Sequence, residues 1–170
     1  MQPREIAEVL NHPLSKELLD QQLTRLSYVA EDGTPRVVPI AFVWNDSEIV
    51  MTTAKNAPKL SALREHPAVA LSIDTNDFPP KILLVRGRAK LDPVDGIPDE
   101  YLQANNATKM SPEQREQWEI EIRSLYVDGM VRIVVTPTWV KLIDFDSTLP
   151  SAVQELMDQR EARRRASTNR

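Results

Sequence analysis

The chain has no cysteine and only two histidines, His12 and His66, among its 170 residues. The lack of cysteine excludes disulfides, thiolate metal sites and a cysteine nucleophile. It is compatible with a reducing cytoplasm, which is the location that we expect. The sequence has no cluster of histidines and carboxylates at metal-ligand spacing, so we expect no metal. Each histidine is better explained by the end of a helix than by a role as catalytic base.

Other absences narrow the function classes further. The chain has only four glycines, and none of them forms a glycine-rich phosphate loop. No set of serine, histidine and acid can be assembled with confidence, so the catalytic residues are unknown and a hydrolase is poorly supported. No apolar segment approaches the roughly 20 residues that span a bilayer, and none resembles a signal peptide. We therefore expect a soluble protein with no membrane partner.

The net charge of −4 argues against a general affinity for nucleic acid. One local exception is the segment 160–165, which contains four arginines. It could contact RNA, DNA or an acidic partner, but the solvated end of a C-terminal helix explains it more simply. The length and the 41% hydrophobic content fit one domain over residues 1–150, followed by a helix and basic tail over 151–170.

The hydrophobic pattern changes from helical to strand periodicity after the first 20 residues. Helices are predicted over Arg4–Asp20 with a break at Pro13, over Lys59–Glu65, and in two segments before residue 130. Period-two alternation predicts strands over Leu26–Ala30, Val37–Trp44, Ile49–Thr53, Val69–Ile73, Ile82–Leu91, Met130–Val135 and Trp139–Phe145. This order predicts a mainly β fold, a small closed or split barrel of six or seven antiparallel strands with peripheral helices.

The helix before residue 130 has a clear start signal. Ser111 is a suitable N-cap, and a proline and a glutamine follow at the N1 and N3 positions. The spacing of four apolar residues further along predicts that they share one face of the helix. These residues are Trp118, Ile122, Leu125 and Tyr126.

The segment from residue 49 to residue 60 offers the clearest chemistry in the chain. A strand leads into Thr52 and Thr53, followed by Lys55 and by Lys59 in the first turn of a short helix. Hydroxyl groups, ammonium groups and a helix N-terminus suit an anion such as phosphate. Pro58 weakens this interpretation because it removes one amide donor. Threonines also favour strands and lysines favour surfaces, so the segment has a purely structural explanation too.

Two further segments are candidates for contact with a ligand or a partner. Pro39 lies inside a predicted strand, Val37–Val38–Pro39–Ile40, and therefore belongs at an edge, a bulge or a place where a flat ligand lies on the backbone. An edge strand protected from aggregation explains it equally well. Lys81 follows a rigid loop and is placed to reach a partner subunit. Arg86 and Arg88 share one face of a strand, where exposed ion pairs are more common than ligand contacts.

These segments together resemble one known family. They are Asp32–Ile40, Met51–Thr53, Lys59–Leu60, Leu63, His66–Leu71, Val85–Ala89, Pro137–Lys141 and Thr148–Ala152. The pattern is similar to that of the FMN-binding split-barrel proteins related to pyridoxamine 5′-phosphate oxidase, which include reductases that depend on the deazaflavin F420. The resemblance is continuous from about Leu23 to Leu91.

The resemblance implies a flavin-dependent oxidoreductase that acts as a homodimer with a cofactor at the subunit interface. The flavin ring would lie along Val37–Ile40, and the phosphate near Thr52, Thr53, Lys55 and Lys59, with the strand from Lys81 approaching from the partner. FMN is favoured over F420. The acidic tail of F420 would need basic residues at the mouth of the pocket, and Lys55, Lys81 and Arg86 could bind it. The flavin would transfer hydride to an unidentified small substrate.

This sequence also departs from the oxidase pattern. Ala57–Pro58–Lys59 stands where the oxidase commonly has Ser–Arg–Lys, and no histidine follows His66, so the Arg–x–His substrate motif is missing. Oxidation of vitamin B6 is therefore not expected. Two alternatives stay open: a non-catalytic homodimer that holds flavin or haem for storage or sensing, and a degenerate member that binds no cofactor.

Overall fold

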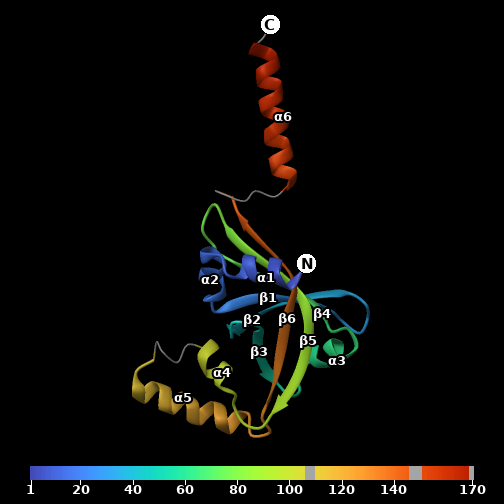
Figure 1. The fold of residues 1–170 in the computed structure, drawn as a ribbon. Coiled ribbons are helices and arrows are strands. Elements are labelled where there is room, and N and C mark those ends of the chain that lie inside the picture. The colour runs from blue at the N-terminus through green and yellow to red at the C-terminus, as the bar shows by residue number, and fades with distance from the viewer. Residues whose placement is uncertain (106–109, 146–150, 169–170) are drawn as a thin grey trace.

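The structure, a computed structural model, describes residues 1–105, 110–145 and 151–168. Within the last range, side chains are described only for residues 151–165. Its centre is a closed barrel of antiparallel strands in the order β1-β2-β3-β6-β5-β4 (Figure 1). The strands are β1 Leu23–Val29, β2 Pro35–Trp44, β3 Ile49–Ala54, β4 Ala68–Asp74, β5 Lys81–Val94 and β6 Met130–Asp144. The predicted barrel with peripheral helices is therefore confirmed.

The helices lie at the ends and on the outside of this barrel. They are α1 Pro3–Leu10, α2 Pro13–Leu19, α3 Lys59–Glu65, α4 Asp99–Ala104, α5 Pro112–Leu125 and α6 Ser151–Thr168. The break predicted at Pro13 separates α1 from α2, and His12 caps α2 by accepting a hydrogen bond from the Leu14 N–H. None of the described helices is both long and apolar enough to cross a membrane.

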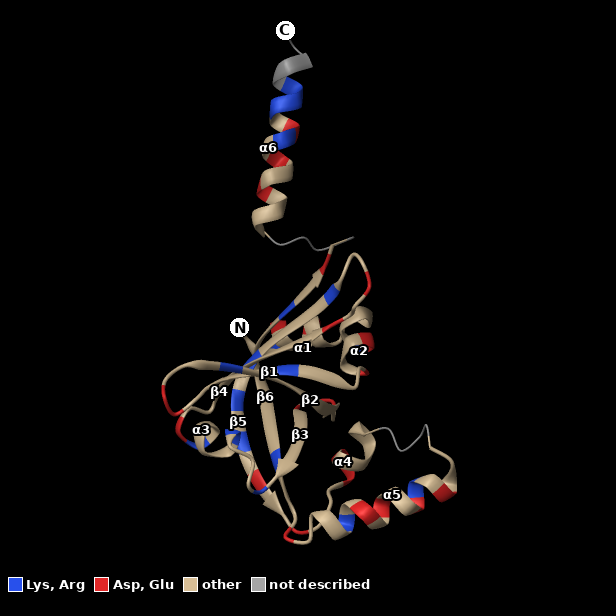
Figure 2. Ribbon diagram, turned by 180° about the vertical axis from the view of Figure 1, so that it is seen from behind, with Lys and Arg blue, Asp and Glu red and all other residues tan. Residues whose placement is uncertain are grey.

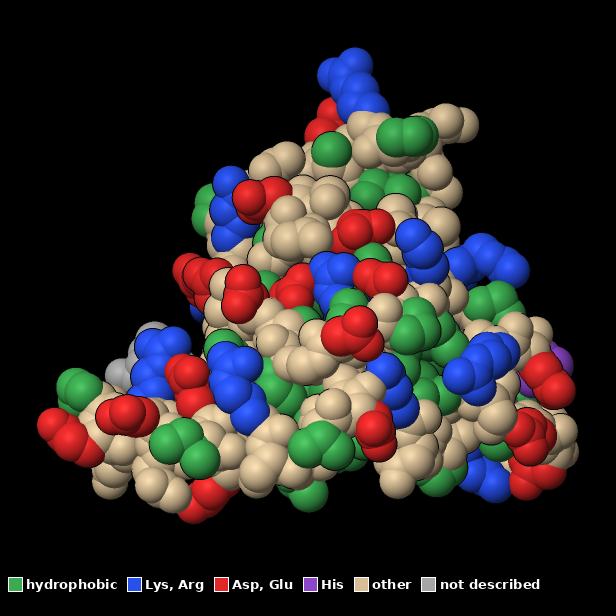
Figure 3. All heavy atoms as spheres, turned by 90° about the horizontal axis from the view of Figure 1, so that it is seen from below, with side chains coloured by type: hydrophobic (Ala, Val, Ile, Leu, Met, Phe, Trp, Pro, Cys, Tyr) green, Lys and Arg blue, Asp and Glu red, His purple; other side chains and the backbone are tan. Residues whose placement is uncertain are grey.

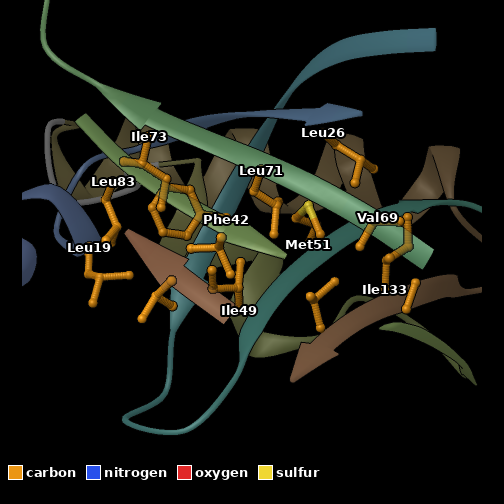
Figure 4. Close-up of a cluster of buried hydrophobic side chains, with 14 of the residues drawn as sticks. Leu19, Leu26, Phe42, Ile49, Met51, Val69, Leu71, Ile73, Leu83 and Ile133 are labelled. Atoms are coloured by element: carbon orange, nitrogen blue, oxygen red, sulfur yellow. The ribbon is translucent and has the colours of Figure 1, made fainter. Parts of the chain in front are cut away.

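Alternate residues of each strand fill the barrel (Figure 4). The inward side chains include Leu26 of β1, Phe42 of β2, Met51 of β3 and Ile133 of β6, and each is at most 2% exposed. Leu14, Leu18 and Leu19 of α2 join the same core and close one end of it. The period-two pattern of the sequence therefore fixes which side chains point inward, because successive strand residues face opposite sides.

The last strand corrects one boundary. Two strands, Met130–Val135 and Trp139–Phe145, were expected on either side of Pro137, but β6 is continuous. The pairing between β5 and β6 shifts register here: Arg86 faces Trp139, whereas Gly87 faces Pro137. The bulge accommodates a residue that lacks an N–H donor without ending the strand.

Helix α5 confirms one prediction and corrects another. The Ser111 hydroxyl accepts from the Gln114 N–H, as the capping motif predicts. Ile122 is buried, and Trp118 and Tyr126 pack on Tyr101 of α4 at centroid distances of 6.1 and 5.7 Å. Leu125, however, is 70% exposed. Leu125 is the last residue of α5 and its side chain stays in solvent, whereas Tyr126, the C-cap residue, packs on Tyr101.

Helix α6 projects away from the barrel (Figures 1 and 2). All of its described side chains, residues 151–165, are exposed. Arg165 forms an ion pair with Glu161 at 3.7 Å on the same helix. This placement agrees with a solvated helix. At the opposite end of the molecule, which carries α4 and α5, side chains of both signs are intermixed (Figure 3).

Deleting residues 151–170 is expected to change the free energy of unfolding by less than about 0.5 kcal/mol, because the described part of α6 buries no side chain. Urea denaturation of both chains measures this difference. Leu18→Ala, which removes a core side chain, is the positive control and should cost about 2–5 kcal/mol. A loss above about 1 kcal/mol on deletion would show that α6 packs against the folded protein.

Gly87→Ala should destabilise the fold by about 1–3 kcal/mol. A Cβ at this position would lie 2.5 Å from the Thr136 carbonyl oxygen and 2.7 Å from Val135 Cγ1, so the bulge must shift. Arg88→Ala, on an exposed neighbour, is the matched control and should stay within about 0.5 kcal/mol. Equal urea midpoints for the two variants would contradict this account of the bulge.

Candidate functional site

The barrel has an opening between β2 and β3. These strands pair only from Phe42 to Trp44 and from Ile49 to Met51. Beyond that point, β2 pairs only with β1 on its other side, and Thr52–Ala54 of β3 pair only with β6. Among the described residues, no strand therefore fills the space between residues 37–41 and 52–54. We call this space the β2–β3 gap.

The gap exposes one edge of β2. The Phe42 N–H points toward β1, where it donates to the Gln22 carbonyl at 3.3 Å. Because backbone groups alternate between the two edges of a strand, Val37, Pro39 and Ala41 direct theirs into the gap. Pro39 has no N–H to leave unpaired there, which confirms that it lies at a strand edge. The Val37 side chain is 63% exposed, whereas Val38 and Ile40 pack toward the core.

The two threonines of β3 lie on opposite faces of the strand. Thr53 pairs with Val131, a core residue, and Thr52 pairs with Arg132 on the outer face. A ligand that lies on either face therefore meets one hydroxyl and not both, because neighbouring strand residues alternate.

Arg132 is a charged residue beside Thr52 that we did not predict from the sequence. Its guanidinium bonds Asp92 at 2.8 Å and also Glu100, which ties α4 to the barrel. Burial lowers the pKa of Arg132, but the bonds to Glu100 and Asp92 outweigh it and raise that pKa overall. Its only sequence signal is a lone arginine in an apolar strand. Because the carboxylates of Asp92 and Glu100 neutralise its charge, we assign Arg132 a structural role. Anion binding is expected of the lysines instead.

Lys55 and Lys59 lie beyond the end of β3, at one end of the gap. Two tight turns bring them there: the Ala57 N–H donates to the Ala54 carbonyl, and the Leu60 N–H to the Ala57 carbonyl. Lys55 Nζ is 3.8 Å from the exposed Asp95 carboxylate. Lys59 is the first residue of α3, is half-buried, and has no ion pair within the described residues. Burial lowers its pKa.

Lys81 does not reach this site in one chain. It begins β5 at the end of the barrel opposite α3, and its ammonium lies 3.9 Å from Glu17. Arg86 stacks on Trp139 at 4.2 Å from the ring centroid. Neither Arg86 nor Arg88 forms an ion pair within the described residues, so the exposed ion pairs expected for them are absent there. The structure therefore brings together the β2 edge, the threonines, Lys55 and Lys59.

Residues 10–140 match the family model described as pyridoxamine 5′-phosphate oxidase. The chain belongs to this family. The family expected from the sequence is therefore confirmed. Comparison with curated proteins gives no match.

Several solved structures have a similar fold. An F420 reductase is 28% identical, covers 74% of this chain and 94% of its own, and superposes with a TM-score of 0.60. A conserved hypothetical protein from Mycobacterium tuberculosis is 16% identical over 85% of each chain, with a TM-score of 0.57. A FAD-binding protein from Mesorhizobium loti is 22% identical over 84% of this chain and 94% of its own, with a TM-score of 0.50.

Lys59→Ala should not lower the stability of the protein without ligand. The ammonium is half-buried without an ion pair, so its burial contributes cost rather than stabilisation. We expect a free energy of unfolding that is equal to or above that of the wild type at neutral pH. Because the pKa is lower in the folded state, the wild type should gain stability relative to the variant as pH rises from the lowered pKa toward 10.5.

Urea denaturation at several pH values measures both effects. Lys90→Ala, which removes an exposed lysine from β5, is the matched control. A loss above about 1 kcal/mol in Lys59→Ala alone would mean that Lys59 supports the fold rather than a ligand.

Proposed function

We propose that this protein is a flavin-dependent oxidoreductase that holds a flavin or deazaflavin in the β2–β3 gap and transfers hydride to a small substrate other than vitamin B6. The observation that carries the proposal is the coincidence of an unpaired strand edge with two lysines at one end of the same gap. A flat, hydrogen-bonding ring with a phosphate chain suits both parts.

The residues present fit such a cofactor. The ring would lie along Val37–Ile40 and would take hydrogen bonds from the backbone groups that no described strand satisfies. The phosphate would be held by Lys55 and Lys59, and it would supply a negative charge beside the half-buried Lys59 ammonium. One of Thr52 and Thr53 adds a hydroxyl donor. The bound cofactor supplies the hydride chemistry, and the chain binds it, orients it and limits the access of water.

The identity of the cofactor is a choice between FMN and F420. The sequence alone favours FMN, whereas the 28% identical solved structure, which spans most of both chains, is named F420 reductase. Two lysines at the gap suit a phosphate in either case. F420 is the cofactor to test first, with FMN beside it.

A homodimer is part of this proposal. Part of the outer face of the sheet formed by β1, β2, β4 and β5 is exposed, although α4 packs against the Phe42–Trp44 end of β2. It exposes Leu23 at 59% and Val37 at 63%, and small residues such as Ala68 and Ala70 leave it flat. A flat, partly apolar sheet face suits a self-complementary interface with a two-fold axis.

The visible absorption spectrum of the purified protein, with and without added FMN and F420, tests the proposal directly. We expect a protein-bound flavin or deazaflavin band, and consumption of a nicotinamide or reduced F420 donor when an acceptor is present. A band without turnover by any donor would favour the storage or sensing protein. The lack of any retained band would contradict the proposal, and a Soret band would indicate haem instead.

Lys59→Ala should weaken cofactor binding by about 1–3 kcal/mol, roughly 10- to 100-fold in Kd, through loss of a charged hydrogen bond. Fluorescence titration with FMN and with F420 measures the change. Lys90→Ala is again the matched control and should bind as the wild type does. Unchanged affinity in Lys59→Ala would place the phosphate elsewhere.

A further inference from the structure

Helix α6 presents one stripe of side chains that no described residue of the chain covers. At about 3.6 residues per turn, Val153, Leu156 and Met157 share one side of the helix, and they are 36%, 65% and 44% exposed. The same side continues into Arg160 and Arg163, in the half of α6 that lies farther from the barrel (Figure 2). The carboxylates of the helix lie on its other sides: Glu155, Asp158 and Glu161. This α6 stripe is therefore apolar near the barrel and basic beyond it.

Helix α5 presents the reverse pattern on its solvent face. Ile120 is 57% exposed and lies opposite the side that packs on α4. Glu116 and Glu113 precede it by four and seven residues, so they share its face, and both are exposed. Arg123, at the edge of this face, is held toward Glu119 by an ion pair at 3.7 Å. The α5 face is therefore acidic at its start and apolar further along.

The spacing of the two patterns matches when the helices run antiparallel. In α6, arginines follow Leu156 at four and seven residues; in α5, glutamates precede Ile120 at the same two distances. An antiparallel pair with Leu156 on Ile120 therefore places Arg160 opposite Glu116, and the next arginine opposite the next glutamate. A second α6 fits less well, because a parallel pair would bring the arginines together and an antiparallel pair would place them against the apolar half.

The contact requires a second copy of the chain. Helix α5 adjoins the end of the barrel where Val94 faces Met130, whereas α6 follows the end where Lys81 faces Asp144. The 14 residues of β5, at about 3.3 Å each, separate the two ends by roughly 45 Å. Helix α6 also points away from α5 (Figures 1 and 2). A two-fold axis would let each copy offer its α6 to the α5 of the other.

We propose that α6 of one copy docks antiparallel on the solvent face of α5 of a second copy, with Leu156 on Ile120 and Arg160 on Glu116. The contact uses neither the β2–β3 gap nor the sheet face of the proposed homodimer, so it does not rest on the proposed function. Two short helix faces bury little surface, and exposed ion pairs contribute little. The contact therefore forms at high protein concentration and dissociates on dilution, which leaves the unfolding of dilute protein unaffected by the loss of α6.

Cysteine cross-linking tests the docking without any cofactor, because the chain has no cysteine of its own. Full-length chains with Leu156→Cys and tagged chains with Ile120→Cys are mixed at high concentration and oxidised. We expect a disulfide-linked heterodimer whose yield falls on dilution. Gln154→Cys, at an exposed position on the other side of α6, replaces Leu156→Cys as the matched control and should give about fivefold less heterodimer. Equal yields for the two mixtures, or no heterodimer with Leu156→Cys, would overturn the proposal.

A charge swap tests the register of the two helices. Arg160→Glu in the Leu156→Cys chain places like charges opposite each other, and we expect the heterodimer yield to fall about threefold. Glu116→Arg in the Ile120→Cys chain restores opposite charges and should return the yield to its original value. Arg165→Glu, off the α6 stripe, is the matched control and should leave the yield unchanged. A loss that Glu116→Arg does not restore would overturn the register.

Nucleic acid is the other occupant that an arginine-containing helix could take. Fluorescence anisotropy of a labelled poly(U) RNA, titrated with the full-length protein, distinguishes it from a second copy. We expect no RNA binding that depends on Arg160, because the acidic residues of α6 keep its net charge low. RNA binding that Arg160→Glu abolishes, together with no cross-link between Leu156→Cys and Ile120→Cys chains, would overturn the proposal in favour of a nucleic-acid site.

Discussion

The site depends on the point at which β2 and β3 stop pairing. Below Phe42 and Met51 the barrel wall is continuous, and its backbone groups satisfy one another. Above that point the two strands keep different neighbours, and a row of donors and acceptors on β2 has no strand partner among the residues that the structure describes. Unpaired backbone groups in a partly apolar surface are costly unless water or a ligand meets them. Because Pro39 has no N–H group, it leaves one fewer unpaired donor at this edge and so lowers the free-energy cost, while the gap stays open.

Most elements of the fold were predictable because their signals are local. The predicted helix Lys59–Glu65 coincides with α3, since Pro58 and His66–Pro67 bound it on both sides. The break in β6 was wrongly predicted because the sequence shows Pro137 but does not show the bulge that accommodates it. The exposed Leu125 was misplaced for a related reason, since helical spacing puts it on the face of Trp118 and Ile122 but does not show that its side chain at the end of α5 stays in solvent.

The site was only partly predictable, because its central feature is a missing pairing between strands. Val37, Thr52 and Lys59 could be singled out by residue type, but the gap that joins them follows from the pairing of whole strands. Arg132 is the clearest omission: its partners Asp92 and Glu100 lie 40 and 32 residues away in the chain. The opposed faces of Thr52 and Thr53, in contrast, follow from strand alternation alone and were open to prediction.

Strands β5 and β6 are much longer than the wall that they help to form. With 14 and 15 residues at about 3.3 Å each, they extend roughly 45–50 Å, whereas β3 has only 6 residues. Their shared end, where Lys81 faces Asp144, therefore extends beyond β3, and β4 continues alongside it as far as the pair Asp74–Ile82. The inward side chains of this end, Ile73 and Leu83, belong to the packed core. The β4–β5 loop and the last residues of β6 are thus anchored to the same rigid wall, so the two cannot move independently of each other or of the core.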